Sequence, residues 1–202
     1  MLNAVKLVAA AITLSFTLVA CGGSQQSSVA VPESDSASAV QEWDTEDTEL
    51  TVDEVESMLA ALEEATGAAR AEIQAGSLFY SPNGIFSADA LDPAKPTDYN
   101  EYAINIYLDT SELTPYDYGG ADSYDALKTT LFPAGAFTPE LIVNTVKDSF
   151  SRVTGDAAEL RVSGVTVARN LDGVLEMTVL NGTERDQQSV MYDSTGQFVR
   201  VS

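Results

Sequence analysis

Tyrosine and aspartate side chains are concentrated in the stretch YDYGGADSYD, residues 116–125. Tyrosines supply rigid contact area with a polar end, and carboxylates beside them can meet a cation, an amine or sugar hydroxyls. A calcium ion is an alternative ligand, although the spacing of the acids differs from that of an EF-hand loop. The structural alternative is that Asp122 or Ser123 caps a short helix while the tyrosines cover the edge of the core. The candidate ligand-binding residues are Tyr116, Asp117, Tyr118, Asp122, Tyr124 and Asp125.

Catalytic chemistry is restricted because the sequence contains no histidine. Without imidazole there is no Ser-His-Asp triad, no histidine general base and no histidine ligand for a metal. Asp109-Thr110-Ser111 is similar to an aspartic protease loop, but that chemistry needs two aspartates and the sequence has one copy, followed by Glu112. The alternative is that Asp109 and Thr110 make turn hydrogen bonds at a strand end. We expect no enzyme, no cofactor, no bound metal and no catalytic residue, and a hydrolase using two carboxylates is the third hypothesis.

The charge of the chain excludes one class of partner. The 202 residues include 31 acidic and 10 basic side chains, which gives a net charge of −21. Binding of nucleic acid depends on basic residues that neutralise phosphates. We therefore expect no nucleic-acid partner, and the length suffices for one domain of ordinary size.

Residues 1–20 have the pattern of an export signal, because the single charge at Lys6 precedes an apolar run too short to span a bilayer comfortably. The run ends at Leu18-Val19-Ala20-Cys21, which resembles the lipobox of bacterial lipoproteins. The resemblance implies that the sulfur of Cys21 receives a diacylglyceryl group and that the chain is cut before this residue. The lipidated N-terminus would hold the protein on the extracytoplasmic side of a cell membrane. The alternative is an ordinary signal peptide with Cys21 as an unused thiol.

The segment that begins with the cysteine, residues 21–48, is predicted to be a disordered acidic tether. It is rich in Ser, Gly, Gln and acids, and twelve acidic residues and no Lys or Arg lie between Cys21 and Ala69. Low hydrophobicity and charge repulsion cannot offset the entropy cost of ordering such a segment. The alternative is that Trp43, among acids, is an aromatic anchor for a partner.

Two segments have the apolar spacing of a helix packed on a core. The first is predicted over residues 51–74, with Thr51 and Glu54 in a capping-box arrangement, Ala60 and Ala61 on the broadened buried face, and Gly76 at its end. The second begins at Thr138-Pro139 and is followed by Gly155. A short helix is predicted over 123–131.

Alternating residues predict strands on both sides of the turn at Pro82-Asn83-Gly84 and over residues 101–109, where Leu108 would share the buried side. Residues 91–100, with two prolines, are predicted to be a loop. The last part of the chain is predicted to form a four-stranded antiparallel meander, with a bulge at Gly164. Its strands are predicted to end at Asp172-Gly173, Asn181-Gly182 and Ser194-Thr195-Gly196.

The predicted fold class is therefore α+β, with helices packed on an antiparallel sheet in a single domain, residues 49–202. The order of elements is compatible with two related halves, 49–135 and 136–202, each a helix followed by strands.

The last hairpin, VMYDSTGQFVRV at residues 190–201, resembles the closing hairpin of PepSY domains, in which an Asp precedes a Thr-Gly turn. The helix-then-sheet order from residue 138 is also similar, although the turn spacing is one residue short. The resemblance implies an exported regulator or inhibitor of a protease.

These observations favour a lipid-anchored, non-enzymatic binding or accessory module of the cell envelope. Its expected partners are the membrane, through diacylglyceryl-Cys21, and an envelope protein, a peptide or a glycan. The PepSY-like protease regulator is the second hypothesis.

The lipobox interpretation predicts the consequence of Cys21→Ala. Without the sulfur there is no acyl acceptor, so the protein should be released to the medium or remain unprocessed. Fractionation of cells and metabolic labelling with a fatty acid measure this. Mutant protein that is still lipidated and membrane-bound would contradict the interpretation.

Overall fold

The computed structural model describes residues 49–116, 121–183 and 185–202. Cys21, the predicted signal and the tether lie outside these residues, as do Trp43, Asp117 and Tyr118. Asp122 is placed within a helix, but its side chain is not among the described groups.

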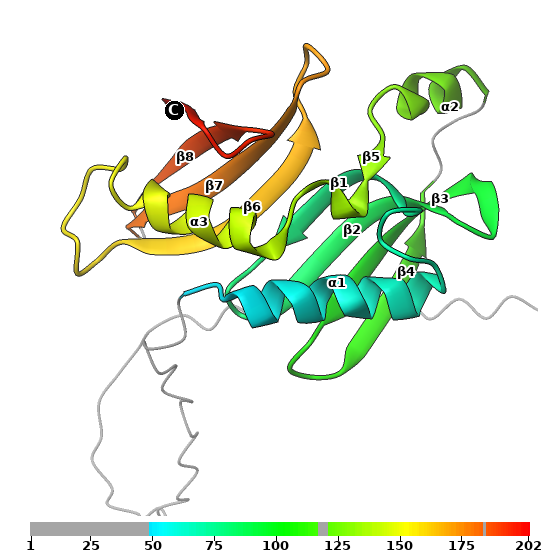
Figure 1. Ribbon diagram of the computed structural model, residues 1–202, viewed down its shortest axis with the longest axis horizontal. Helices are drawn as coiled ribbons and strands as arrows, with labels where there is room; N and C mark the ends of the chain where they lie inside the picture. Colours follow the sequence, from blue (N-terminus) through cyan, green and yellow to red (C-terminus); the bar gives the residue numbers. More distant parts are fainter. Residues whose placement is uncertain (1–48, 117–120, 184) are drawn as a thin grey trace, which may run out of the picture. The chain divides into compact units, whose positions relative to one another are not determined.

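Within the described residues, nine strands form one antiparallel sheet, with helices packed against it (Figure 1). The sheet order is β4-β3-β2-β1-β6-β7-β8-β9, and β5 pairs with β1. The predicted α+β class and the C-terminal four-stranded meander are confirmed. The elements in chain order are α1 (Val52–Thr66), β1 (Gln74–Tyr80), β2 (Ile85–Asp92), β3 (Lys95–Asn105), β4 (Thr110–Pro115), α2 (Ala121–Lys128), β5 (Phe132–Pro133), the 3-10 turn η1 (Ala134–Ala136), α3 (Pro139–Ser149), β6 (Arg161–Arg169), β7 (Leu175–Thr183), β8 (Asp186–Asp193) and β9 (Phe198–Val201).

The two halves repeat one arrangement, a helix followed by an antiparallel meander. α1 precedes β1 to β4, and α3 precedes β6 to β9. β1 and β6 pair antiparallel, with Leu78 opposite Val167 and Tyr80 opposite Val165. This ladder joins both meanders into one sheet.

α1 and α3 contact each other and pack on the same face of the sheet, where they share one hydrophobic core (Figure 1). The sheet contributes alternate residues to this core, as period-2 alternation requires. The fully buried side chains of this core include Met58, Leu59 and Leu62 of α1, Ile142 and Val146 of α3, and Tyr80, Phe86, Val165, Met177 and Tyr192 of the sheet.

α1 is shorter than predicted. The capping box at Thr51 and Glu54 is present, but the helix ends at Thr66, and Gly67 adopts a left-handed φ of 68°. Arg70 then binds back to the helix, donating to Glu56 at 2.7 Å and to Glu63 at 3.0 Å. The side chain of Arg70 therefore fixes the reversal of the chain that the apolar pattern alone predicted as continuous helix.

The loop predicted over residues 91–100 is wrong, because β3 begins at Lys95. The Oδ1 atom of Asp92 accepts the N–H groups of Ala94 at 2.8 Å and Lys95 at 3.3 Å, which closes a tight turn. The ladder shifts register between Leu91 and Asp92, so both prolines lie outside its regular part.

Three further predicted boundaries are corrected. α2 spans Ala121–Lys128, so neither Asp122 nor Ser123 precedes it as a cap. α3 ends at Ser149 with Phe150 as its C-cap, so Gly155 is not the residue that ends it. β7 continues through Asn181 and Gly182, which pair with β8. The bulge at Gly164 is confirmed by the register shift against β7.

Candidate functional site

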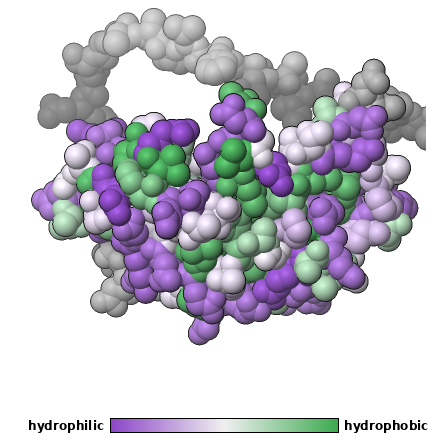
Figure 2. Space-filling view, turned by 45° about the horizontal axis from the view of Figure 1, so that its top comes forward, coloured by the Kyte–Doolittle hydropathy of each residue, from purple (hydrophilic) through white to green (hydrophobic). Residues whose placement is uncertain are grey.

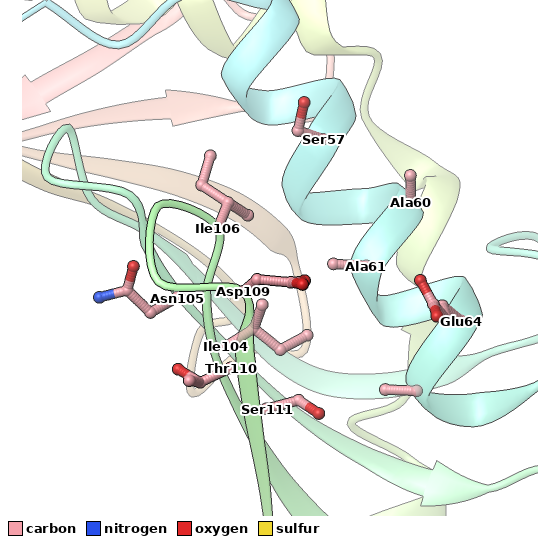
Figure 3. Close-up of a pocket in the computed structure, with 11 residues that line it drawn as sticks. Ser57, Ala60, Ala61, Glu64, Ile104, Asn105, Ile106, Asp109, Thr110 and Ser111 are labelled. Carbon is pink, nitrogen blue, oxygen red and sulfur yellow. The ribbon is translucent and has the colours of Figure 1, made fainter.

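A groove of about 620 Å³ lies between α1 and the hairpin that joins β3 to β4 (Figure 3). α1 forms one wall, and the end of β3, the turn and the start of β4 form the other. The lining residues are Ser57, Ala60, Ala61, Glu64, Ala65, Ile104, Asn105, Ile106, Asp109, Thr110 and Ser111.

The groove exists because α1 presents small side chains to this end of the sheet. Ser57, Ala61 and Ala65 recur at intervals of four residues and therefore lie on one helical face. Ala60 is exposed rather than buried, so the prediction that it broadens the core face is wrong. Small side chains leave the space above β4 unfilled.

Hydrogen bonds hold the hairpin that forms the second wall. The Oδ1 atom of Asn105 accepts the N–H groups of Tyr107 at 3.0 Å and Leu108 at 3.1 Å. Asp109 adopts a positive φ of 50°. Asn105, not Asp109 or Thr110, therefore accepts these two turn hydrogen bonds, and Leu108 is 70% exposed rather than on the buried side.

The carboxylate of Glu54 connects the hairpin to the start of α1. Its Oε2 atom accepts from the backbone N–H and the hydroxyl of Thr51, both at 2.8 Å, and its Oε1 atom accepts the hydroxyl of Tyr107. Tyr107 packs against Gly84, where a Cβ atom would lie 2.5 Å from the ring. One side chain thus caps the helix and holds the hairpin against it.

The groove is negatively charged. Glu64 and Asp109 line it from opposite walls, and none of its described lining residues is a lysine or arginine. Figure 3 shows Asp109 directed from the hairpin toward α1. Both carboxylates are exposed to solvent. Two carboxylates with nearby hydroxyls can accept hydrogen bonds from an ammonium or guanidinium group.

The predicted tyrosine and aspartate site is only partly described. Tyr116 stacks against Tyr99 with ring centroids 5.5 Å apart, and its hydroxyl donates to Asp89 at 3.2 Å. Asp89 also accepts the hydroxyl of Ser77 at 2.6 Å. Burial, and then the negative charge of Asp89, raise the pKa of the Tyr116 hydroxyl, so it acts as a donor. Tyr116 is therefore tied to the first half of the sheet, beyond the end of β4.

The other described members of that site belong to α2. Asp125 forms an ion pair with Lys128 at 2.7 Å, and the Nζ atom of Lys128 lies 4.6 Å from the centre of the Tyr124 ring. The hydroxyl of Tyr124 donates to the carbonyl of Pro96. Tyr116 and Tyr124 thus have different partners. Because Asp117, Tyr118 and the side chain of Asp122 are outside the described groups, the ligand site at residues 116–125 stays a prediction.

The exposed apolar side chains are more dispersed than the residues that line the groove. Exposed apolar side chains come from several elements, and hydrophilic areas separate the hydrophobic ones on the face seen in Figure 2. In the parts of the chain that the structure describes, no three Cys, Asp or Glu side chains are grouped as metal ligands, and no helix is long and apolar enough to cross a membrane.

Comparison with known proteins gives one structural similarity. No family model matches the chain, and no curated protein matches it. A crystal structure of a "putative lipoprotein" from Clostridium difficile 630 is similar with a TM-score of 0.45 and 9% identity, over 71% of this chain and 88% of that one. A similarity at this level carries no argument about the function of this chain.

The Glu54–Tyr107 hydrogen bond predicts the effect of Tyr107→Phe. This change removes the donor and keeps the ring against Gly84, so the free energy of unfolding should fall by about 0.5–1 kcal/mol. Amide hydrogen exchange of residues 106–109 should accelerate. Tyr124→Phe is the matched control, because it removes a hydroxyl bonded to Pro96 and should leave this hairpin unchanged. Unaltered exchange in Tyr107→Phe would show that the hydroxyl does not hold the hairpin.

Proposed function

We propose that this chain is a lipid-anchored binding protein on the extracytoplasmic side of a cell membrane. We further propose that the groove between α1 and the β3–β4 hairpin binds a positively charged group of an envelope protein or peptide. The observation that carries this proposal is the pair of carboxylates, Glu64 and Asp109, on facing walls of a groove lined by no described basic residue.

The net charge of the chain supports a cationic partner. A charge of −21 attracts positive ligands over distance and repels anionic ones, and this steering weakens as salt rises. Anionic lipid head groups would be repelled too. The lipobox resemblance at Leu18-Val19-Ala20-Cys21 and the acidic segment 21–48 support a domain tethered near a membrane but held away from its surface.

Binding is favoured over catalysis by the surroundings of the two carboxylates. A carboxyl group that acts as a general acid is normally desolvated or placed beside another negative charge. Glu64 and Asp109 are exposed, and they come from opposite walls of an open groove. This arrangement suits a cation that spans the two walls. The two-carboxylate hydrolase stays the third hypothesis.

The PepSY-like regulator stays the second hypothesis, and its motif has a structural explanation here. The Oδ1 atom of Asp193 accepts the hydroxyl of Thr195 at 2.7 Å and the N–H groups of Thr195 at 2.8 Å and Gln197 at 3.0 Å. These bonds, the Thr195 hydroxyl first, lower the pKa of the Asp193 carboxyl. The motif therefore closes the β8–β9 turn, a role that requires no protease partner.

Titration with a cationic probe tests the proposal. The probe is a fluorescent, acetylated and amidated octapeptide of alternating valine and lysine, titrated into the full mature chain at fixed low salt. The double variant Glu64→Gln/Asp109→Asn should weaken binding about fivefold to tenfold, the combined value of two exposed charge pairs.

The matched control is Glu159→Gln/Asp172→Asn, which removes the same charge at exposed positions outside the groove. The control should bind the probe with an affinity within about twofold of the wild type, because charges outside the groove contribute little to the electrostatic potential within it. Equal weakening in both double variants, or no binding of the probe to any of them, would contradict the groove as the binding site.

A further inference from the structure

Within the described part of the chain, β4 is an edge strand whose backbone offers hydrogen-bonding groups that no other strand uses. Among the residues that the structure describes, β4 pairs only with β3, and all six of its residues are exposed. An edge strand of this kind is a template on which an additional strand can pair.

The register assigns which groups face outward. The N–H of Tyr116 donates to the carbonyl of Tyr99 at 2.8 Å, so this is a hydrogen-bonded pair. In an antiparallel ladder such pairs alternate with pairs that do not exchange hydrogen bonds. Glu112 and Thr114 therefore bind β3, and Ser111 and Leu113 direct their N–H and C=O groups away from the sheet.

Pro115 fits the same assignment. It lies opposite Asn100, a position at which the backbone nitrogen faces outward and forms no bond to β3. Proline in a sheet is confined to such edge positions because it has no N–H group to donate. The outward edge thus presents the donors of Ser111 and Leu113, and its donor row ends at Pro115.

The side chains of Ser111 and Leu113 lie on the same face of the sheet as the groove. Ser111 lies opposite Ile104 and Leu113 lies opposite Tyr102, and directly opposed residues share a face. Ile104 and Tyr102 are buried in the core under the helices, so Ser111 and Leu113 project to the groove side. Leu113 is 50% exposed there.

We propose that the partner of the groove is an extended cationic peptide segment that adds to the sheet antiparallel to β4. This inference rests on the proposed function and names the form of its ligand. The residues that hydrogen-bond to Ser111 and Leu113 are the residues whose side chains enter the groove. Those side chains are lysines or arginines, positioned to meet Asp109 and Glu64.

A cationic segment fits this edge better than a second copy of the chain. Two β4 strands paired with each other would bring the carboxylates of Glu112 in both copies onto one short edge, and each copy carries a charge of −21. Like charges placed across a strand pair are destabilising. A cationic strand instead neutralises Glu64 and Asp109 while its backbone satisfies the outward groups of β4.

The experiment compares two N-methylated forms of the valine–lysine octapeptide with the parent peptide. N-methylation of the lysine amides removes the donors that face β4 and should weaken binding at least about tenfold, because the hydrogen bonds to the carbonyls of Ser111 and Leu113 are lost. N-methylation of the valine amides alters the outer side of the peptide and should leave affinity within about threefold of the parent. All three peptides carry the same charge, and the protein is unchanged, so altered folding cannot cause the difference.

A variant of the protein tests the same backbone hydrogen bonds between β4 and the peptide. Leu113→Pro removes an outward N–H and should weaken binding about fivefold relative to Leu113→Ala, because both variants lose the leucine side chain and only the first loses the donor. Circular dichroism and urea unfolding verify that both variants fold.

The results separate failure of this inference from failure of the proposed function. If both N-methylated peptides bind like the parent, and Glu64→Gln/Asp109→Asn still weakens all three, the cation site stands and strand addition is overturned. If no peptide depends on Glu64 and Asp109, the proposed function fails as well. A peptide-free dimer that Leu113→Pro disrupts and Leu113→Ala does not, measured by sedimentation, would assign the edge to a second copy and overturn the inference.

Discussion

The antiparallel pairing of β1 with β6 is the interaction on which the rest of the structure depends. It joins two helix-and-meander halves into one sheet and gives α1 and α3 a shared core. Gly164 adjoins this ladder and lets the ring of Phe79 lie close to the backbone, because a Cβ atom there would lie 2.3 Å from that ring. Because the halves join through β1 and β6, β4 and β9 are left at the two ends of the sheet path. The groove beside α1 therefore lies at an edge of the sheet, where an additional strand can reach it.

The sequence predicts those elements in which one face is buried. The apolar stripe of α3, the turn at Pro82-Asn83-Gly84 and the bulge at Gly164 all follow from local patterns, and each is present. β4 was not predicted because all six of its residues are exposed and show no alternation. The end of α1 was misplaced because Gly67 and the bonds of Arg70 to two glutamates outweigh an apolar spacing that continues beyond Thr66.

The groove was not predicted because it depends on contacts between distant residues. Glu54 and Tyr107 are 53 positions apart, and their hydrogen bond brings the hairpin to α1. The capping role of Glu54 follows from its spacing to Thr51, whereas its second partner does not. The small residues Ser57, Ala61 and Ala65 are the available signal, since small side chains on one helical face leave space beside it. The tyrosine-rich stretch gave a stronger sequence signal, yet its described members bind partners within the chain.

In the proposal, β4 and the adjoining groove together bind an extended cationic chain. Hydrogen exchange of individual backbone amides, measured by NMR with and without the valine–lysine octapeptide, tests it most directly. If the peptide pairs with β4, exchange should slow at Ser111 and Leu113, while Glu112 and Thr114, already bonded to β3, should change little. Slowed exchange elsewhere in the chain, with Ser111 and Leu113 unchanged at a saturating concentration of peptide, would contradict it.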